Sequence, residues 1–410
     1  MSSVDPIGII ELGDKNLKCL IFKIDKNNNP EILSTSTTPS EGILNDVIVN
    51  LKKASNAIRL SISTAEKKAK ISLKKINVVL EQPDFLCTKF SKHKKIDGSK
   101  IRRHDIEFLL KEAKKQLILN DKKQSIIHIF NHNYVVDGKI FVEEPIDVFA
   151  DSLSHEMTFI SAPKNNLRNI NQSFIDCDIE IERLISKTFT LGAELLNLEE
   201  LQSGSAIINF GYKKISLGLF KNFALVHSIT LPIGIDHITA DISKVCSLSF
   251  YESQSITNSI DLSFENNKKL FDENNFLKNN FFIDSNFRKI SENLILSVVK
   301  ARLDEIFQIL KKQLIVPGFN FKSEVNFFIT GESSELLNLE KYSINFFGKN
   351  VSRKVKNNYD KQDTLIKNFT SCLGALKIIK DGWETEAIPE LREKNIEKIG
   401  FFAKFFGNYS

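Results

Sequence analysis

A diluted internal repeat most strongly constrains how this chain can fold. Segment 9–15, Ile-Ile-Glu-Leu-Gly-Asp-Lys, is echoed 198 positions later by segment 207–213, Ile-Ile-Asn-Phe-Gly-Tyr-Lys. In each copy apolar residues lead to one glycine and resume after a few polar positions, which predicts two strands joined by a tight turn. Glycine lets a backbone turn approach a ligand closely, and turn N–H groups can converge on an anion. One such hairpin would be ordinary, but the repeat favours a paired cradle for the phosphates of one nucleotide.

Length and charge limit the class of protein. A chain of 410 residues is expected to form two domains with subdomains, and its 42% hydrophobic and 26% charged content is typical of a soluble globular protein. The net charge of +5 is too small and too spread out for a nucleic-acid binder. The basic run 92–95, Lys-His-Lys-Lys, is interpreted as a solvated loop before a helix rather than a phosphate track.

Cysteine usage and the chain start indicate a reducing cytoplasm. The five cysteines are scattered and never spaced as C-x-x-C, so neither a disulfide framework nor a zinc site is expected. The first residues show no basic segment followed by an apolar one, and no run approaches about 18 apolar residues. We therefore expect a protein that is neither exported nor membrane-spanning.

Beyond the first hairpin, the chain alternates between helical and strand patterns. Apolar spacing predicts a long helix over 43–70 and a strand at 76–80. From 81 to 163, short β-rich pieces surround one helix, 103–116, which indicates an inserted α+β subdomain. The strands of this insert are expected at 85–90, 126–130, 133–136, 139–142 and 157–161.

The second half of the chain predicts a loop, a helix and a glycine turn. Segment 251–286 is rich in Asn, Phe and Ser and is interpreted as a surface loop. Segment 291–314 has the period of an amphipathic helix. A buried strand at 325–329 then ends in Thr330 and Gly331, and such a turn can lay its backbone beside a nucleoside because glycine has no side chain. A glycine after a strand is also commonplace, so this signal is weak alone.

Several motifs resemble the FtsA family of the actin-like ATPase superfamily. They include 40–46 (Ser-Glu-Gly-Ile-Leu-Asn-Asp), 231–242, which opens with Leu-Pro-Ile-Gly, 302–306 (Arg-Leu-Asp-Glu-Ile) and 369–376. Segment 126–134 resembles a strand pair of the subdomain that FtsA inserts. The order of first hairpin, insert, second hairpin and Thr-Gly turn is also that of the family.

The resemblance implies an α/β, actin-like (ribonuclease H-like) fold of two domains, with an inserted α+β subdomain and a C-terminal amphipathic helix. The implied parts are subdomain 1A at 1–80, 164–200 and 359–383, the inserted subdomain 1C at 81–163, subdomain 2A at 201–240 and 305–358, subdomain 2B at 241–304, a linker at 384–395 and the terminal helix at 396–410.

The resemblance also implies an ATP site with Mg²⁺, but the phosphate motifs are degenerate. The family usually has a hydroxyl residue at position 14 and Asp-x-Gly-Gly-Gly-Thr from position 209, where this chain has Asp14 and Asn209. Losing the carboxylate at 209 removes a partner for hydrated magnesium, although the lysines could bind phosphate as point charges. We expect weak or absent ATPase activity. The nucleotide-binding candidates are Gly13, Asp14, Lys15, Gly211, Tyr212, Lys213, Lys214, Gly331, Glu332 and Ser333.

The C-terminal segment has the pattern of a membrane-surface helix. Within 396–409, Glu397, Gly400 and Lys404 share a narrow arc, and apolar residues fill the opposite face. The segment is too short to span a bilayer, but a Phe-rich face beside lysines suits the headgroup region. Docking on its own domain or on a partner protein is the alternative. The membrane-binding candidates are Ile399, Phe401, Phe402, Phe405 and Phe406.

The resemblance implies a cell-division adaptor at the inner face of the cytoplasmic membrane, at the division site. Its implied partners are the C-terminal peptide of the division GTPase FtsZ, further copies of itself in filaments, later division proteins and the membrane, but no nucleic acid. Arg302 and Glu305 are the candidates for charge pairing with the peptide; a surface salt bridge explains them equally well. Two alternatives stay open: an actin-like assembly platform of a pilus or secretion system, and a phosphotransferase of the same superfamily.

Overall fold

The computed structural model describes residues 6–264, 267–315, 325–334, 336–348, 350–354 and 366–381. The chain divides into two compact units. The first unit comprises 1–205, 218–229 and 356–410, and the second comprises 206–217 and 230–355.

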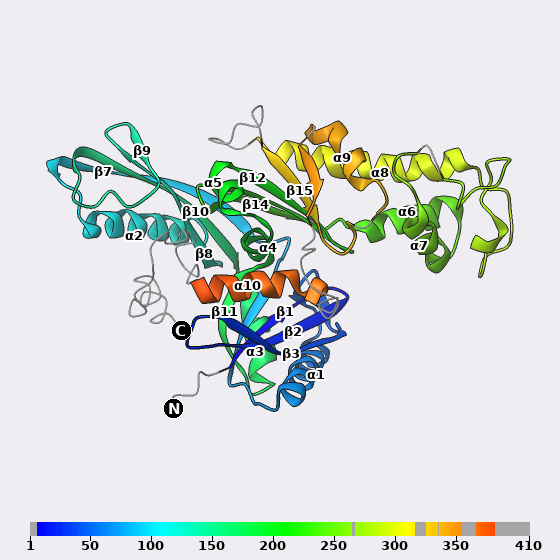
Figure 1. The fold of residues 1–410 in the computed structure, drawn as a ribbon, viewed down its shortest axis with the longest axis horizontal. Helices are drawn as coiled ribbons and strands as arrows, with labels where there is room; N and C mark the ends of the chain where they lie inside the picture. Colours follow the sequence, from blue (N-terminus) through cyan, green and yellow to red (C-terminus); the bar gives the residue numbers. More distant parts are fainter. Residues whose placement is uncertain are drawn as a thin grey trace. The chain divides into compact units, whose positions relative to one another are not determined.

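A five-stranded sheet forms the base of the first unit (Figure 1), with the strand order β11-β6-β1-β2-β3. Strand β1 pairs antiparallel with β2 and parallel with β6, and β6 pairs parallel with β11. The carboxyl ends of these three parallel strands therefore meet at one edge of the sheet. The strands are β1 (Ile7–Glu11), β2 (Asn16–Ile24), β3 (Pro30–Pro39), β6 (Lys75–Leu80) and β11 (Glu180–Ser186).

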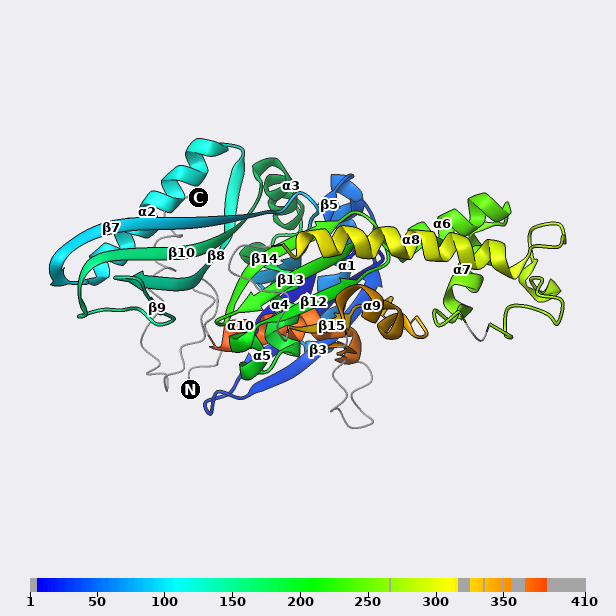
Figure 2. The same ribbon diagram turned by 90° about the horizontal axis from the view of Figure 1, so that it is seen from above.

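The insert between β6 and β11 is an antiparallel sheet with one helix (Figure 2). Its strand order is β7-β10-β8-β9, and helix α2 (Arg103–Asn120) packs against β7 and β10. The strands are β7 (Leu86–Lys100), β8 (Gln124–Val136), β9 (Lys139–Phe141) and β10 (Phe149–Pro163). The predicted α+β character is confirmed.

Two expectations for this insert were wrong in detail. The basic run 92–95 is not a loop: it lies within β7, whose register against β10 is continuous from Leu86 to Lys95. The predicted strands 126–130 and 133–136 are one strand, β8. The pairing of β8 with β10 shifts its register between Glu156 and Met157 of β10, and this irregularity accommodates the break in the alternation of apolar and polar residues. Strand β7 lies at the edge of its sheet. Lysines on an edge strand prevent pairing with strands of other molecules, which explains why a strand can have the basic sequence of a loop.

The third sheet repeats the topology of the first. Its order is β14-β13-β12-β15-β16, so the first strand of each half lies in the middle, with two hairpin strands on one side and two later strands on the other. This shared order confirms the internal repeat. The strands are β12 (Ser205–Phe210), β13 (Ile215–Lys221), β14 (Ala224–Leu231), β15 (Asn326–Thr330) and β16 (Val351–Arg353).

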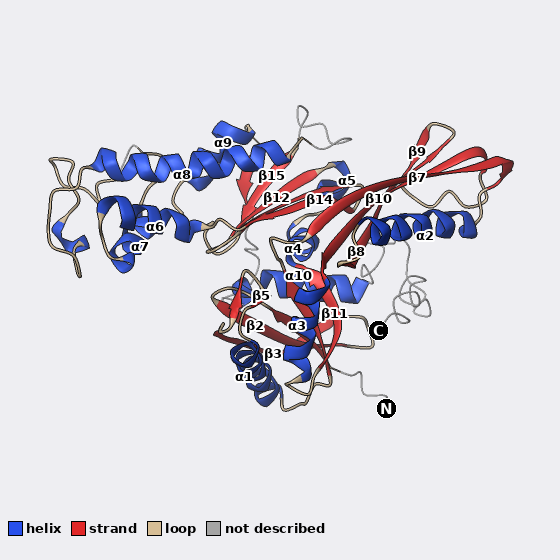
Figure 3. Cartoon of the chain, turned by 180° about the vertical axis from the view of Figure 1, so that it is seen from behind, coloured by secondary structure: helices blue, strands red, loops and turns tan. Residues whose placement is uncertain are grey.

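The second unit contains a helical group (Figure 3), in which α6 packs against both α7 and α8. The helices are α6 (Ile235–Cys246), α7 (Phe250–Ser259), α8 (Glu292–Gln313), α9 (Leu339–Phe347) and the short 3-10 helix η1 (Asn279–Phe281). The predicted loop 251–286 was therefore partly wrong, because α7 and η1 lie in it. Ser249 starts α7 by accepting the Glu252 N–H, a cap that lies just before the Asn-rich region.

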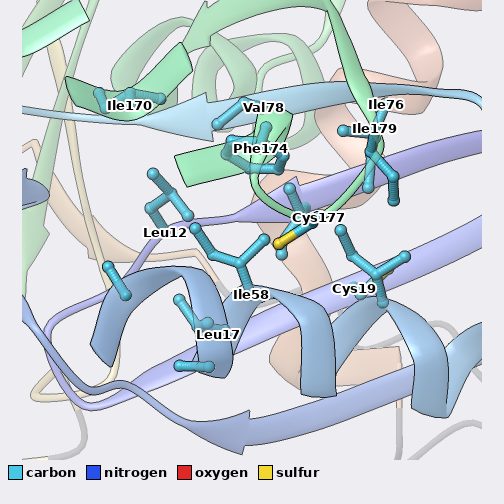
Figure 4. Packing of buried hydrophobic residues seen from close by; sticks show 14 of the residues in the cluster. Leu12, Leu17, Cys19, Ile58, Ile76, Val78, Ile170, Phe174, Cys177 and Ile179 are labelled. Atoms are coloured by element: carbon cyan, nitrogen blue, oxygen red, sulfur yellow. The ribbon is translucent and has the colours of Figure 1, made fainter. Parts of the chain in front are cut away.

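Helices cover both faces of the first sheet. Helix α1 (Leu51–Ala69) packs on β2, β3 and α3 (Lys164–Ile175), whereas α10 (Thr370–Asp381) packs on β1, β2 and α4 (Lys187–Leu195). Figure 4 shows the core on the α1 side, where Ile58 lies near Phe174 and Cys177. The remaining described helices of this unit are α5 (Leu198–Ser203) and the 3-10 turn η2 (Ile366–Phe369).

The helix predicted over 43–70 begins eight residues later than expected. Residues 43–48 form a two-stranded hairpin, β4 (Ile43–Leu44) and β5 (Val47–Ile48), because Asn45 and Asp46 take left-handed conformations that suit a tight hairpin turn. Helix α1 starts only at Leu51, where the Asn50 side chain accepts the Lys53 N–H. Among the described residues, no helix is both long enough and apolar enough to cross a membrane.

Candidate nucleotide and partner sites

The first glycine turn closes the β1–β2 hairpin. The register places Glu11 opposite Lys18 and leaves Gly13, Asp14 and Lys15 in the connection. A Cβ on Gly13 would lie 2.6 Å from the carbonyl oxygen of Asn16, so only glycine fits this turn without a backbone shift. Of the three predicted nucleotide-binding residues here, Lys15 is exposed, while Gly13 and Asp14 are half-buried.

Asp14 has a structural role in this turn. Its carboxylate accepts the backbone N–H of Asn45, the first left-handed residue of the β4–β5 turn. The next residue, Asp46, is fully buried and accepts the Glu81 N–H at 2.7 Å. Asp14 thus ties the glycine turn to the β4–β5 hairpin.

A buried ion pair lies at the end of β1. Glu11 is 3% exposed; its Oε1 accepts from Lys187 Nζ at 2.7 Å, and its Oε2 accepts from the Ser371 hydroxyl. Burial alone would raise the pKa of Glu11, but Lys18 and Lys187 lower it to about 2. Both carboxylate oxygens are therefore engaged inside the first unit.

The start of α4 completes this cluster at the carboxyl ends of the parallel strands. The Glu81 carboxylate accepts from the Ser186 hydroxyl at 2.9 Å and from the Thr188 N–H at 2.8 Å. The Ser186 N–H donates to Nε2 of His128, which links strand β8 of the insert to this edge. Burial lowers the pKa of His128 to about 3, so this histidine is a neutral acceptor in the folded chain.

The second glycine turn, Gly211 to Lys214, rests on the start of α6. The Gly211 N–H donates to the Lys214 carbonyl at 3.0 Å, and the Tyr212 carbonyl accepts the Asp236 N–H at 3.0 Å. A Cβ on Gly234 would lie 2.2 Å from the Tyr212 carbonyl oxygen, so the close approach requires glycine. The Gly211 amide is thereby used within the turn, and Lys214 is buried, whereas Tyr212 and Lys213 are half-buried.

The Thr-Gly turn lies directly against this second hairpin. Gly331 has φ of +103°, and a Cβ there would lie 2.4 Å from the Phe210 carbonyl oxygen. The Ser333 N–H donates to the same carbonyl at 3.0 Å. The structure thus brings two of the three predicted nucleotide elements together within the second unit; Glu332 at the turn is exposed.

The residues present do not fit a carboxylate-held Mg²⁺. Glu11 already binds an ammonium and a hydroxyl, and Asn209, 5% exposed, is neutral and lies 3.5 Å from the Ser216 hydroxyl. Among the described residues, no group of three or more His, Cys, Asp or Glu side chains could hold a metal ion. Mg²⁺ is commonly held by one or two carboxylates together with water and substrate phosphates, and at these turns Glu11 is already paired and Asn209 carries no charge.

Arg302 and Glu305, the predicted partner-binding residues, form a charge network on the helical group. Arg302 donates two hydrogen bonds to Asp241 of α6, from Nε at 2.6 Å and from Nη2 at 3.0 Å, and its third nitrogen, Nη1, donates to Glu305 at 2.6 Å. The Arg302 side chain is 24% exposed and that of Glu305 is 50% exposed. Glu305 is therefore the member of the pair that faces solvent.

The membrane-binding candidates Ile399, Phe401, Phe402, Phe405 and Phe406 lie outside the described residues.

Sequence reasoning missed the cluster of Glu11, Lys187 and Ser371, although Glu11 precedes the first glycine turn. The available signal was Lys187 itself, a cation at the first position of a helix, where acidic residues are preferred.

Comparison with known proteins identifies the inserted domain and the fold. The insert matches the family model described as the SHS2 domain inserted in FtsA, over residues 86–161. The fold is similar to that of a solved PilM–PilN type IV pilus biogenesis complex, with a TM-score of 0.61 and 12% identity over 92% of this chain and 99% of that chain. The chain thus has the actin-like fold with an inserted SHS2 domain, as predicted.

The sequence relatives are more specific. The chain is 20% identical to cell division protein FtsA of Agrobacterium fabrum over 84% of this chain and 80% of that protein. It is 22% identical to cell division protein FtsA of Bacillus subtilis, over 74% of this chain and 68% of that protein. The resemblance to FtsA is therefore confirmed.

Proposed function

We propose that this chain acts in cell division as an FtsA-type adaptor, which attaches FtsZ filaments to the inner face of the cytoplasmic membrane and recruits later division proteins. The observation that carries the proposal is the SHS2 domain of the FtsA type, placed inside an actin-like fold whose sequence relatives are division proteins. The apolar face predicted for 396–410 would supply the membrane contact, and self-association would add weak anchors together.

The FtsZ C-terminal peptide is proposed to bind the second unit beside Glu305. Arg302 is held by Asp241 on one side and Glu305 on the other, so it serves to orient Glu305 rather than to meet the peptide alone. A half-exposed carboxylate fixed by such a pair can bind a basic side chain with little further loss of side-chain freedom.

Fluorescence anisotropy with a labelled FtsZ C-terminal peptide tests this site. Glu305→Lys should weaken binding about tenfold, because a single charge-assisted contact contributes about 1.5 kcal/mol. Glu112→Lys on α2 of the first unit is the matched charge reversal and should leave the affinity unchanged. No binding of the peptide to the unmodified chain would overturn the proposal that it receives FtsZ.

ATP is proposed to bind weakly and not to be hydrolysed efficiently. Lys213 beside the second turn can bind phosphate as a point charge, but the Gly211 amide is used within that turn, and the carboxylates that would position a metal and water are engaged or absent. Phosphate release should therefore be slow or undetectable.

A pilus assembly platform is the second candidate. The fold similarity to the PilM–PilN complex favours it. At 12% identity that likeness concerns the fold alone, whereas the FtsA relatives align by sequence over most of the chain. The cell-division proposal is therefore preferred.

A further inference from the structure

The Glu11–Lys187 pair lies where the first phosphate hairpin ends. Glu11 is the last residue of β1, and Lys187 is the first residue of α4, directly after β11. These positions belong to the edge where the parallel strands β1, β6 and β11 end, the part of an α/β sheet that binds ligands. The pair therefore stands in the ligand-binding region of the first unit, not in its apolar core.

The pair leaves little room for another cation. Lys187 Nζ lies 2.7 Å from Glu11 Oε1, and Ser371 donates to Glu11 Oε2. The Lys187 side chain is 19% exposed and that of Glu11 is 3% exposed, so solvent screens the pair weakly. A divalent ion approaching this carboxylate would meet an ammonium already in contact with it.

The position of Lys187 is unfavourable on local grounds alone. A cation at the start of a helix opposes the helix dipole, and burial of its stem adds a desolvation cost. The same helix start already has an acidic partner, because Glu81 accepts the Thr188 N–H at 2.8 Å. What compensates Lys187 is its contact with Glu11.

We propose that Lys187 is the built-in counter-ion of the first phosphate hairpin and takes the place of a divalent cation there. The hairpin consequently keeps its geometry without metal and without nucleotide. The inference is independent of the FtsZ adaptor proposal, since it concerns only how Glu11 is neutralised.

Thermal unfolding of the full chain, with EDTA or with millimolar Mn²⁺ or Mg²⁺, tests the inference. The unmodified chain should melt at the same temperature in all three conditions. Lys187→Met should lower the midpoint by on the order of 10 °C, because it removes the ammonium that contacts buried Glu11 and leaves only Lys18, opposite Glu11 in the hairpin, and the Ser371 hydroxyl beside the carboxylate. Divalent cations should restore part of that loss by occupying the vacated place.

Two further variants keep the test decisive. The double change E11Q/K187M removes both charges and should melt closer to the unmodified chain than K187M does, with no response to divalent cations. Lys377→Met is the matched control, because Lys377 is also partly buried but donates to the Ala193 carbonyl.

The contrary results are equally clear. If Mn²⁺ raises the midpoint of the unmodified chain and Glu11→Gln abolishes that rise, Glu11 binds the metal and Lys187 is no substitute. If K187M and K377M have the same midpoint of thermal unfolding, the Lys187 ammonium does not act as the counter-ion of Glu11, and the inference is wrong. If K187M does not fold, the metal response of the unmodified chain and the midpoint of E11Q/K187M still decide the matter.

Discussion

Gly331 is where the close approach of two backbone segments depends on the absence of a side chain. Its φ of +103° and the 2.4 Å that would separate a Cβ from the Phe210 carbonyl oxygen exclude any other residue without a backbone shift. Gly331→Ala should lower the free energy of unfolding by about 3 kcal/mol, through left-handed strain and overlap together. Urea unfolding of the full chain measures this loss.

Gly138 provides the control for that variant. It also has positive φ, +82°, but a Cβ there would meet nothing within 4 Å. Gly138→Ala should cost only about 1 kcal/mol. Equal losses for the two variants would show that the Thr-Gly turn does not pack on the second hairpin as described.

His128 predicts a dependence of stability on pH. Burial lowers its pKa from 6.5 to about 3, so between these values the unfolded chain binds a proton that the folded chain does not. The free energy of unfolding should therefore fall as the pH falls from about 6.5 toward 3, with a contribution of about 1.4 kcal/mol per pH unit. His128→Gln should make this slope shallower.

The same change at an exposed histidine serves as the comparison. His93 is exposed on β7, where its Nδ1 lies 3.1 Å from the Ser154 hydroxyl. The variant His93→Gln should leave the dependence of the free energy of unfolding on pH unchanged. A slope that His128→Gln does not alter would contradict the assignment of His128 as a buried neutral acceptor.

Local pattern predicted some of these residues and not others. Glycine turns were predicted at Gly13, Gly211 and Gly331 because an apolar strand followed by glycine can be recognised within a few neighbouring positions of the sequence. Glu11 gave no such signal, since its partners Lys187 and Ser371 are 176 and 360 residues away. Pairings at that separation depend on the folded sheet, which a single sequence does not display.

At the scale of elements, Glu252 fixes a loop to the start of α7. The carboxylate accepts the backbone N–H groups of Ile283, Asp284 and Ser285 at 2.6 to 2.9 Å. Burial alone would raise the pKa of Glu252, but hydrogen bonds from the Ser285 hydroxyl and from backbone N–H groups, that of Ser285 first, hold it far below its usual range. Glu252→Gln would replace one acceptor oxygen with a donor group facing donors, at a cost of about 2 kcal/mol.

Hydrogen exchange measures the effect of Glu252→Gln at the loop amides that the carboxylate binds. Amides 283–285 should exchange markedly faster in Glu252→Gln, while peptides from the first unit should be unaffected. Glu273→Gln, an exposed acid in the same region, is the control. Protection of 283–285 that survives in Glu252→Gln would mean that the carboxylate does not hold the loop.

Element boundaries show why sequence pattern has limits. The apolar period from 43 to 70 is helical throughout, yet Asn45 and Asp46 form a turn because Asp14 accepts the Asn45 N–H from another hairpin. The basic residues of β7 have no strand pattern of their own, and their pairing with β10 makes them a strand. In both cases a tertiary contact overrides the local preference.

At the scale of the whole molecule, the internal repeat was the most reliable signal. Both five-stranded sheets have the same strand order, so two weakly similar segments predicted the common topology of two halves. A repeat of topology does not require a repeat of chemistry. The first half keeps an acid at the end of its central strand, Glu11, and the second half has Asn209 there.

Co-sedimentation with anionic lipid vesicles tests the central claim most directly, using the full chain, a chain lacking 396–410, and labelled FtsZ C-terminal peptide in both samples. The adaptor account predicts that the full chain pellets with vesicles and carries the peptide with it, whereas the shortened chain binds peptide but stays in solution. If the two chains partition alike, or if the pelleted full chain leaves the peptide in the supernatant, the chain does not tether FtsZ to the membrane.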